Sequence, residues 1–258
     1  MKRSESIGNK IIPIGFFAVL LVLWQWIVDR GIIQRFLLPS PTDVGRTLIK
    51  ILPDIRQHTV VTLTEAFAGF ALSILLALVL AILMDSIPII KKAVYPILLV
   101  SQTVPIIVLA PLFTIWFGFG MLPKIVVVVL VCFFPIVVSL LDGLASVDPD
   151  TINLLRSMKA NRLQIFRLVK LPAAMVSFFS GLRIAATYSI MGAVIGEWLG
   201  GKGGLGLYML RVKNSFALDK TFAVIVVIIV LSMLVFYAIK LIQRIVMPWS
   251  IEAEKIRR

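Results

Sequence analysis

Few residues of this chain could do chemistry, and they lie far apart in the sequence. His58 is the only histidine and Cys132 the only cysteine, so the chain can form neither an intrachain disulfide nor a cysteine cluster for a metal. The HExxH pattern of zinc proteases and the GxSxG pattern of serine hydrolases are both missing. The sequence therefore predicts no catalytic residue and no metal ligand, and it indicates a solvated side chain for His58.

A glycine-rich run at residues 200–206, GGKGGLG, invites a nucleotide-binding interpretation. A phosphate loop needs GxxxxGK followed by serine or threonine, placed after a strand, and this run offers neither. We predict instead a flexible or re-entrant turn on the outer side of a membrane. Without a nucleotide site of its own, any energy source must be external to the chain, and we expect the chain to bind no cofactor.

The elements that must position these residues are membrane spans. The chain is 60% hydrophobic and only 15% charged, against roughly 25% charged residues in ordinary soluble domains. A helix needs about 20 apolar residues to cross a bilayer. Residues 1–258 are therefore predicted to form one all-α integral membrane domain with six transmembrane helices. The six qualifying stretches are 11–28, 60–84, 96–117, 125–141, 174–195 and 222–246.

The basic residues set the orientation of these spans. The 26 Lys and Arg residues exceed the 13 Asp and Glu residues, but they are scattered between apolar stretches and form no single basic face for nucleic acid. Because no small-residue cleavage site follows Ile27, the first stretch is expected to be retained as a span. Both termini, including Arg258, and residues 148–172 are then cytoplasmic, whereas Lys124 and Lys202 are assigned to the outside.

The outer segment at residues 39–57 contains Ser40-Pro41-Thr42-Asp43, which is typical of a helix start. Val44 and Leu48 follow at helical spacing. This pattern predicts either a short amphipathic helix at the outer interface or a simple solvated connector.

The third span has two prolines, and each removes a backbone donor and tends to kink a helix. Polar residues precede the first of them, and polar side chains within a span face other helices or a water-filled cavity. Four residues are therefore candidates for the wall of a path through the membrane: Gln102, Thr103, Pro105 and Pro111. The alternative is hydrogen bonding between helices with no role in passage.

Arg183 lies inside the fifth span, where an arginine needs an acidic or carbonyl partner. Asp142, at the inner end of the fourth span, is a plausible partner, so we predict a structural Arg183–Asp142 contact. Glu65 and Glu197 lie near outer span ends, where they either line an outer gate or are simply solvated.

The cytoplasmic segment at residues 148–172 reads as two short helices. Asp148 can cap the first, and Pro149 suits its first turn. Ile152, Leu155 and Met158 share one face at helical spacing, a break follows near residues 159–161, and Pro172 is expected to stop or kink the second helix. An apolar stripe of this kind either covers the bottom of the bundle or enters a groove on a soluble partner.

Several strings, in order along roughly residues 38–249, resemble type I ABC-importer permeases: SPTDV, QTVPIIVLAPLFTIWFGFG, FFPIVVSLLDGL, VDPD, RSMKANRLQIFRLVKLPAA, GLRIA and GEWLGGKGGLG. Within that group the chain is similar to the nitrate, sulfonate and taurine branch, which includes hydroxymethylpyrimidine permeases. The resemblance implies a MetI-like permease fold in the bacterial plasma membrane, with a coupling helix between the fourth and fifth spans.

The resemblance also implies the partners. These are a cytoplasmic ABC ATPase dimer that uses ATP and Mg²⁺, an extracytoplasmic substrate-binding protein, and a second permease subunit in a homodimer. Arg211, Lys213 and Lys220 become candidate contacts for the binding protein. The residues implied to dock on the ATPase are Asn153, Leu154, Leu155, Arg156, Ser157, Met158, Lys159, Ala160 and Asn161.

The chain departs from the family pattern at two places. Asn153-Leu154-Leu155 stands where Glu-Ala-Ala is usual, and Lys159 stands where the family has glycine. Because asparagine tolerates left-handed backbone geometry, Asn161 is expected to relieve the turn in place of that glycine.

The motifs are most similar to the hydroxymethylpyrimidine branch, with sulfonate, taurine, nitrate or riboflavin import as the alternatives. A different class, an ATP-independent channel or a membrane enzyme subunit, would need a ring of charges or clustered titratable groups at one depth. Neither pattern is visible in the sequence.

Overall fold

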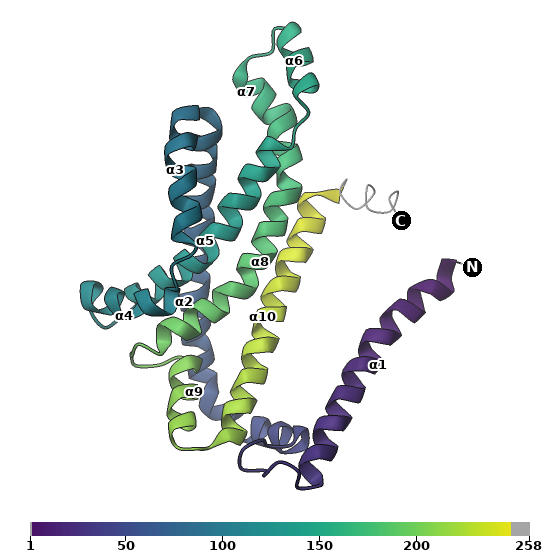
Figure 1. Cartoon of the computed structure of the whole chain (residues 1–258), viewed down its shortest axis with the longest axis vertical. Coiled ribbons are helices and arrows are strands. Elements are labelled where there is room, and N and C mark those ends of the chain that lie inside the picture. The colour runs from purple at the N-terminus through teal and green to yellow at the C-terminus, as the bar shows by residue number, and fades with distance from the viewer. Residues whose placement is uncertain (1, 249–258) are drawn as a thin grey trace. The chain divides into compact units, whose positions relative to one another are not determined.

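The computed structural model describes residues 2–248, with side chains from residue 12 onward, and every regular element in that range is helical (Figure 1). The helices are α1 (Lys2–Asp29), α2 (Pro41–Ser86), α3 (Pro88–Ser101), α4 (Ile106–Phe117), α5 (Met121–Ala145), α6 (Pro149–Ser157), α7 (Arg162–Ile165), η1 (Phe166–Lys170, a π-helical turn), α8 (Leu171–Glu197), α9 (Leu205–Asn214) and α10 (Leu218–Val246). The basic C-terminal end with Arg258 lies outside the described residues.

The chain forms two compact units, and each is made of separate stretches of sequence. One unit comprises the chain up to Arg56 together with Tyr208–Val227, and the other comprises Gln57–Leu207 and the chain from Ile228 onward. The larger unit holds residues 148–172, which we call the coupling segment, together with the third, fourth and fifth predicted spans.

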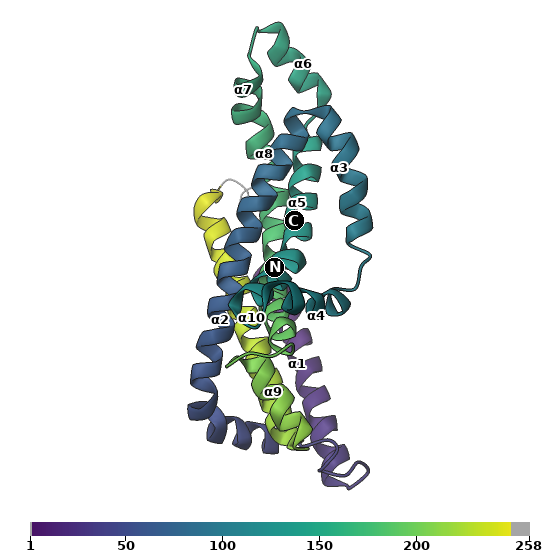
Figure 2. The same ribbon diagram turned by 90° about the vertical axis from the view of Figure 1, so that its left-hand side faces the viewer.

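The predicted all-α membrane class is confirmed. Within the described part of the chain, five helices are long and apolar enough to cross a membrane, and α3 with α4 makes a sixth if that bent pair counts as one span. The third predicted span, residues 96–117, was expected to be kinked by its prolines; in the structure it falls on α3 and α4, which meet at an angle of 102° (Figure 2). The predicted outer helix is part of α2, which continues from Pro41 to Ser86 with Pro53 inside it.

The core of the larger unit lies between α5 and α8, whose inner faces carry small or branched apolar residues. Gly181 of α8 lies so close to α5 that a β-carbon there would come within 2.5 Å of the Pro135 carbonyl oxygen. The Cys132 thiol is buried and donates to the Ala185 carbonyl at 3.3 Å. Since lipid tails are as apolar as these side chains, close packing between small residues is what holds such a helix pair together.

Candidate functional site

The coupling segment projects beyond the ends of α5 and α8 (Figure 1). The Asp148 carboxylate accepts a hydrogen bond from the Asp150 amide at 3.0 Å, and Pro149 occupies the first turn of α6, both as predicted. Asn161 caps α7 reciprocally. Its side chain accepts from the Gln164 amide at 2.8 Å, and the Gln164 side chain accepts from the Asn161 amide at 2.7 Å. Both short helices therefore begin at defined caps.

The turn between the two helices differs from the prediction. Asn161 has φ −77° and ψ 166°, an extended conformation that suits its capping role. Lys159 itself adopts the left-handed conformation, with φ 60°. A lysine there costs roughly 1–2 kcal/mol relative to a right-handed residue. At the position where the resemblance led us to expect glycine, a lysine therefore holds the left-handed geometry.

The apolar residues of α6 are unequally exposed. Leu154 is 63% exposed and Met158 71%, whereas Ile152 and Leu155 are half-buried. The predicted common face of Ile152, Leu155 and Met158 is therefore split: two residues turn toward the protein and the third turns away with Leu154. Large apolar side chains exposed on a polar segment outside the spans are typical of a surface that another protein covers.

The segment is anchored where it returns to the spans. Ile165 of α7 is buried, and the Lys170 ammonium group lies 2.7 Å from the Asp85 carboxylate at the end of α2. Of the two effects expected of Pro172, a stop does not occur, because the chain continues through the π-helical turn η1 directly into α8, with Pro172 in its first turn. Because Lys170 before it is already helical, the missing amide of Pro172 falls within a continuous helical stretch, directly after the π-helical turn η1. Movement of the coupling segment is thereby tied to α8 and α2.

The third predicted span forms an elbow. Its break lies between Ser101 and Ile106, and Pro105 immediately precedes α4 while Pro111 sits inside that helix without ending it. Beside the elbow is an open cavity of about 350 Å³. Of the four predicted wall residues only Gln102 lines it; the Thr103 hydroxyl donates to its own helix at the Val100 carbonyl.

A buried ion pair lies at the other end of α5 from the coupling segment. The Lys124 ammonium group is 2.7 Å from the Glu65 carboxylate, and the two side chains are only 5% and 4% exposed. Lys124, which was assigned to the outer side, is therefore not solvated, and the solvated interpretation of Glu65 is wrong. Each residue was judged by its own neighbours in sequence, whereas burial became possible only because α2 brings an opposite charge to α5.

Glu197 is also buried, and it fastens the glycine-rich run. Its carboxylate accepts hydrogen bonds from the Thr62 hydroxyl at 2.6 Å and from the Gly206 amide. The His58 imidazole, expected to be solvated, accepts from the Gly204 amide at 3.0 Å through Nδ1. The run at residues 200–206 is therefore bonded to α2 and α8. The sequence did contain a hint of this contact, because Glu197 is followed closely by several glycines. A β-carbon at Gly204 would overlap the Glu197 carboxylate, so only glycine fits there.

Arg183 is paired differently from the prediction. Its guanidinium group donates to the Gln243 side chain at 2.9 Å and to the Ser180 hydroxyl at 3.1 Å. Among the described side chains no ion pair joins it to Asp142, which is exposed. The neutral amide of Gln243, far along the sequence in α10, satisfies the arginine in place of the expected carboxylate.

Comparison with known proteins identifies the family. A family model described as the binding-protein-dependent transport system inner membrane component matches residues 69–249. The chain belongs to this family. The permease is 40% identical over 250 residues to the formylaminopyrimidine transport permease protein ThiX of Halalkalibacterium halodurans, covering 96% of this chain and 98% of the relative. It is 31% identical over 234 residues to the riboflavin transport system permease protein RibX of Chloroflexus aurantiacus, covering 90% of this chain and 87% of the relative.

The same fold occurs in a solved transporter. An inward-facing structure of the MetNI methionine ABC transporter contains a chain that superposes with a TM-score of 0.67 at 20% identity, covering 76% of the permease and 98% of that chain. The permease is thus a multi-pass inner-membrane subunit with the expected MetI-like fold, and a non-catalytic one.

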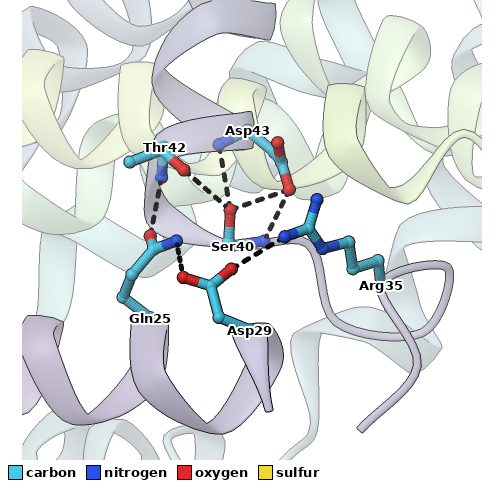
Figure 3. Close-up of polar contacts among 6 residues, drawn as sticks. All are labelled: Gln25, Asp29, Arg35, Ser40, Thr42 and Asp43. Atoms are coloured by element: carbon cyan, nitrogen blue, oxygen red, sulfur yellow. Dashed lines mark hydrogen bonds and ion pairs between the residues drawn. The ribbon is translucent and has the colours of Figure 1, made fainter. Parts of the chain in front are cut away.

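The smaller unit of the permease shows how the SPTDV motif works (Figure 3). The Ser40 hydroxyl accepts from the Asp43 amide at 3.2 Å and donates to the Asp43 carboxylate at 2.7 Å, which starts α2. Gln25 of α1 accepts from the Thr42 amide at 3.2 Å and donates to Asp29 at 2.9 Å. The motif therefore caps α2 and bonds that cap to α1.

The three candidate contacts for a binding protein also belong to this unit. Arg211 and Lys213 lie at the end of α9, and Lys220 lies in the first turn of α10. All three are exposed, and between the two helices Phe216 is 70% exposed. All three candidate contacts are thus accessible to a partner.

Proposed function

We propose that this permease is the membrane subunit of an ATP-driven importer for a thiamine precursor, a small pyrimidine of the formylamino or hydroxymethyl type. The observation that carries this proposal is the 40% identity with ThiX over nearly the full length of both chains. Riboflavin, whose RibX permease is 31% identical, is the second candidate. Sulfonate, taurine or nitrate import remains the more distant alternative.

The exposed coupling segment supports docking of a cytoplasmic ATPase dimer. Leu154 and Met158 offer two adjacent apolar anchors on a helix with defined caps, and Arg156 beside them is exposed. An amphipathic helix that enters a groove through such anchors is a common recognition mode. ATP and Mg²⁺ then belong to the ATPase, and the permease itself binds no cofactor.

The remaining partners and the orientation belong to the same proposal. We place α6 and both termini in the cytoplasm, and the end of the larger unit that holds Lys124 and Glu197 outside. A substrate-binding protein is expected at Arg211, Lys213 and Lys220, and a second copy of the permease completes the path in a homodimer.

Reconstitution tests the proposal. The permease, its ATPase and its binding protein are placed in proteoliposomes, and uptake of radiolabelled formylaminopyrimidine is measured with and without ATP. We expect ATP-dependent uptake that hydroxymethylpyrimidine competes for and riboflavin does not. ATP-dependent uptake of riboflavin or taurine with no uptake of the pyrimidine would overturn the substrate assignment.

A paired variant tests the docking. Leu154→Asp with Met158→Asp should abolish copurification of the ATPase, since two charges cannot enter an apolar groove without counter-ions. Leu37→Asp, in an equally solvent-accessible loop of the smaller unit where Leu37 is 58% exposed, is the matched control and should copurify normally. An undiminished complex in the double variant would refute the docking surface.

A further inference from the structure

The cavity beside the elbow is lined by residues from three parts of the larger unit: the elbow itself, α5 and α8. We propose that it is a binding station for the transported solute within the permease, and that it selects a small neutral heteroaromatic ring over an anion. This inference rests on the proposed import function and adds that the membrane subunit, and not only its soluble partner, distinguishes solutes. The lining residues are Ser101, Gln102, Val104, Ile106, Leu130, Val131, Phe134, Pro135, Val138, Ser139 and Tyr188.

The first argument is a set of polar groups left available at the cavity. Gln102, Ser139 and Tyr188 line the cavity, and within the described part of the chain the side-chain amide of Gln102 and the hydroxyls of Ser139 and Tyr188 take part in no intrachain hydrogen bond. Other hydroxyls of the same helix bundle behave differently. Those of Ser180 and Thr187 donate to carbonyls of their own helix at 3.1 and 2.7 Å, which is the usual way to satisfy a hydroxyl in a span.

The backbone of α5 adds a fourth polar group. Pro135 has no amide hydrogen, so the carbonyl of Val131, four residues earlier, loses the donor that a helix normally gives it. Both residues line the cavity. A carbonyl without its helical donor inside a membrane needs another partner, and a solute with an amino group supplies one.

These groups match the edge of a substituted pyrimidine. An amide offers a donor and an acceptor together, a hydroxyl offers either, and the carbonyl accepts. Ring nitrogens of the solute accept and its exocyclic amino groups donate. The rings of Phe134 and Tyr188 provide apolar faces against which a flat heterocycle packs. The volume, about 350 Å³, lies at the lower end of the roughly 300–1,000 Å³ range of small-molecule sites.

Charge decides between the solute classes. None of the described lining residues is charged, although the chain as a whole carries a net charge of +13. An anion moved into such a site loses its hydration without gaining a counter-ion, which is costly. A neutral ring loses far less. The cavity therefore disfavours taurine, sulfonate and nitrate and accepts a pyrimidine.

A cysteine placed at the rim reports occupancy directly. Val104 is 40% exposed and lines the cavity without offering a polar side chain, so Val104→Cys leaves the proposed contacts in place, and the native Cys132 is buried. The full transporter with this variant is labelled with a membrane-permeant maleimide. We expect formylaminopyrimidine to slow labelling and taurine at the same concentration to have no effect. Equal slowing by taurine would overturn the selectivity, and a cysteine that never reacts in the unliganded transporter would overturn the binding station, because the cavity would then be closed to small molecules.

Transport kinetics give a second, independent readout. Gln102→Leu and Tyr188→Phe should each lower uptake of formylaminopyrimidine by about fivefold, as expected for one lost hydrogen bond, while ATPase activity stimulated by the loaded binding protein stays unchanged. Thr187→Ala is the control, since that residue does not line the cavity and its hydroxyl donates to the Ile184 carbonyl at 2.7 Å. Wild-type uptake in both variants overturns the binding station but leaves the importer proposal standing. Absence of pyrimidine uptake in the wild type would refute the proposed function itself.

Discussion

The buried ion pair gives the most quantitative prediction, for the substitution Lys124→Met. The ammonium group of Lys124 is the cation that meets Glu65, and the second carboxylate oxygen of Glu65 is buried with no hydrogen-bond partner among the described residues. Methionine keeps the length of the side chain but leaves the carboxylate alone. Removing one member of a buried pair costs about 3–5 kcal/mol. At roughly 2–4 °C per kcal/mol for a chain of this size, the midpoint of thermal unfolding should fall by about 10 °C.

The single cysteine makes the measurement simple. Cys132 is buried in the core beside α8, so a maleimide dye that fluoresces on reaction reports unfolding of the purified permease during heating. The double variant Lys124→Met with Glu65→Gln should recover most of the loss, because it removes the unpaired charge.

An exposed pair supplies the control. Arg35 and Asp29 are 2.8 Å apart with side chains 64% and 46% exposed, and a pair in water contributes at most about 1 kcal/mol. Arg35→Met should therefore shift the midpoint by no more than a few degrees. If Lys124→Met destabilised no more than Arg35→Met, or if the double variant were as unstable as the single one, the buried-charge reasoning would be refuted.

Three further predictions concern the backbone and its caps. Lys159→Gly should be about 1 kcal/mol more stable than Lys159→Ala, because only glycine adopts the positive φ without strain; equal unfolding midpoints would contradict this. Gly204→Ala should destabilise by about 1–3 kcal/mol, since its φ is +114° and its β-carbon would overlap the Glu197 carboxylate, whereas Gly45→Ala, with open space around it, should be neutral or stabilising. Asn161→Ala should cost about 1 kcal/mol of local stability through the lost cap. Faster amide exchange confined to α7 would support that cap, and unchanged exchange would count against it.

The sequence was most informative where local chemistry decides the structure. Long apolar stretches predicted α5, α8 and α10, because length and hydropathy alone determine whether a helix can cross a bilayer. The caps at Asp148 and Ser40 were also predictable, since a cap joins residues two or three positions apart.

The sequence did not predict the environment of polar side chains whose hydrogen-bond or ion-pair partner lies on another helix. In the sequence, Lys124 and Glu197 lie at the ends of apolar stretches, where a charged side chain is expected to face water. Both are buried because α2 supplies their hydrogen-bond partners, Glu65 and Thr62. Arg183 was given the nearest plausible acid, yet its partner Gln243 lies sixty residues away in α10. The elbow at residues 102–105 was expected as a kink, because proline reports a missing donor but not how far the chain will turn.

The two ends of the larger unit differ in what they expose and what they bury, and this difference bears on the transport mechanism. At the end with α6 and α7, apolar side chains are exposed and a strained lysine forms the turn, so the surface is incomplete without a partner. At the other end, charged groups are buried and bonded across three helices. The 25 residues of α5 span about 37 Å between them, and α5 packs closely on α8. We therefore expect a displacement of the coupling segment to pass along this helix pair, and Pro135 in α5 and the π-helical turn η1 before α8 are the places where the pair can bend.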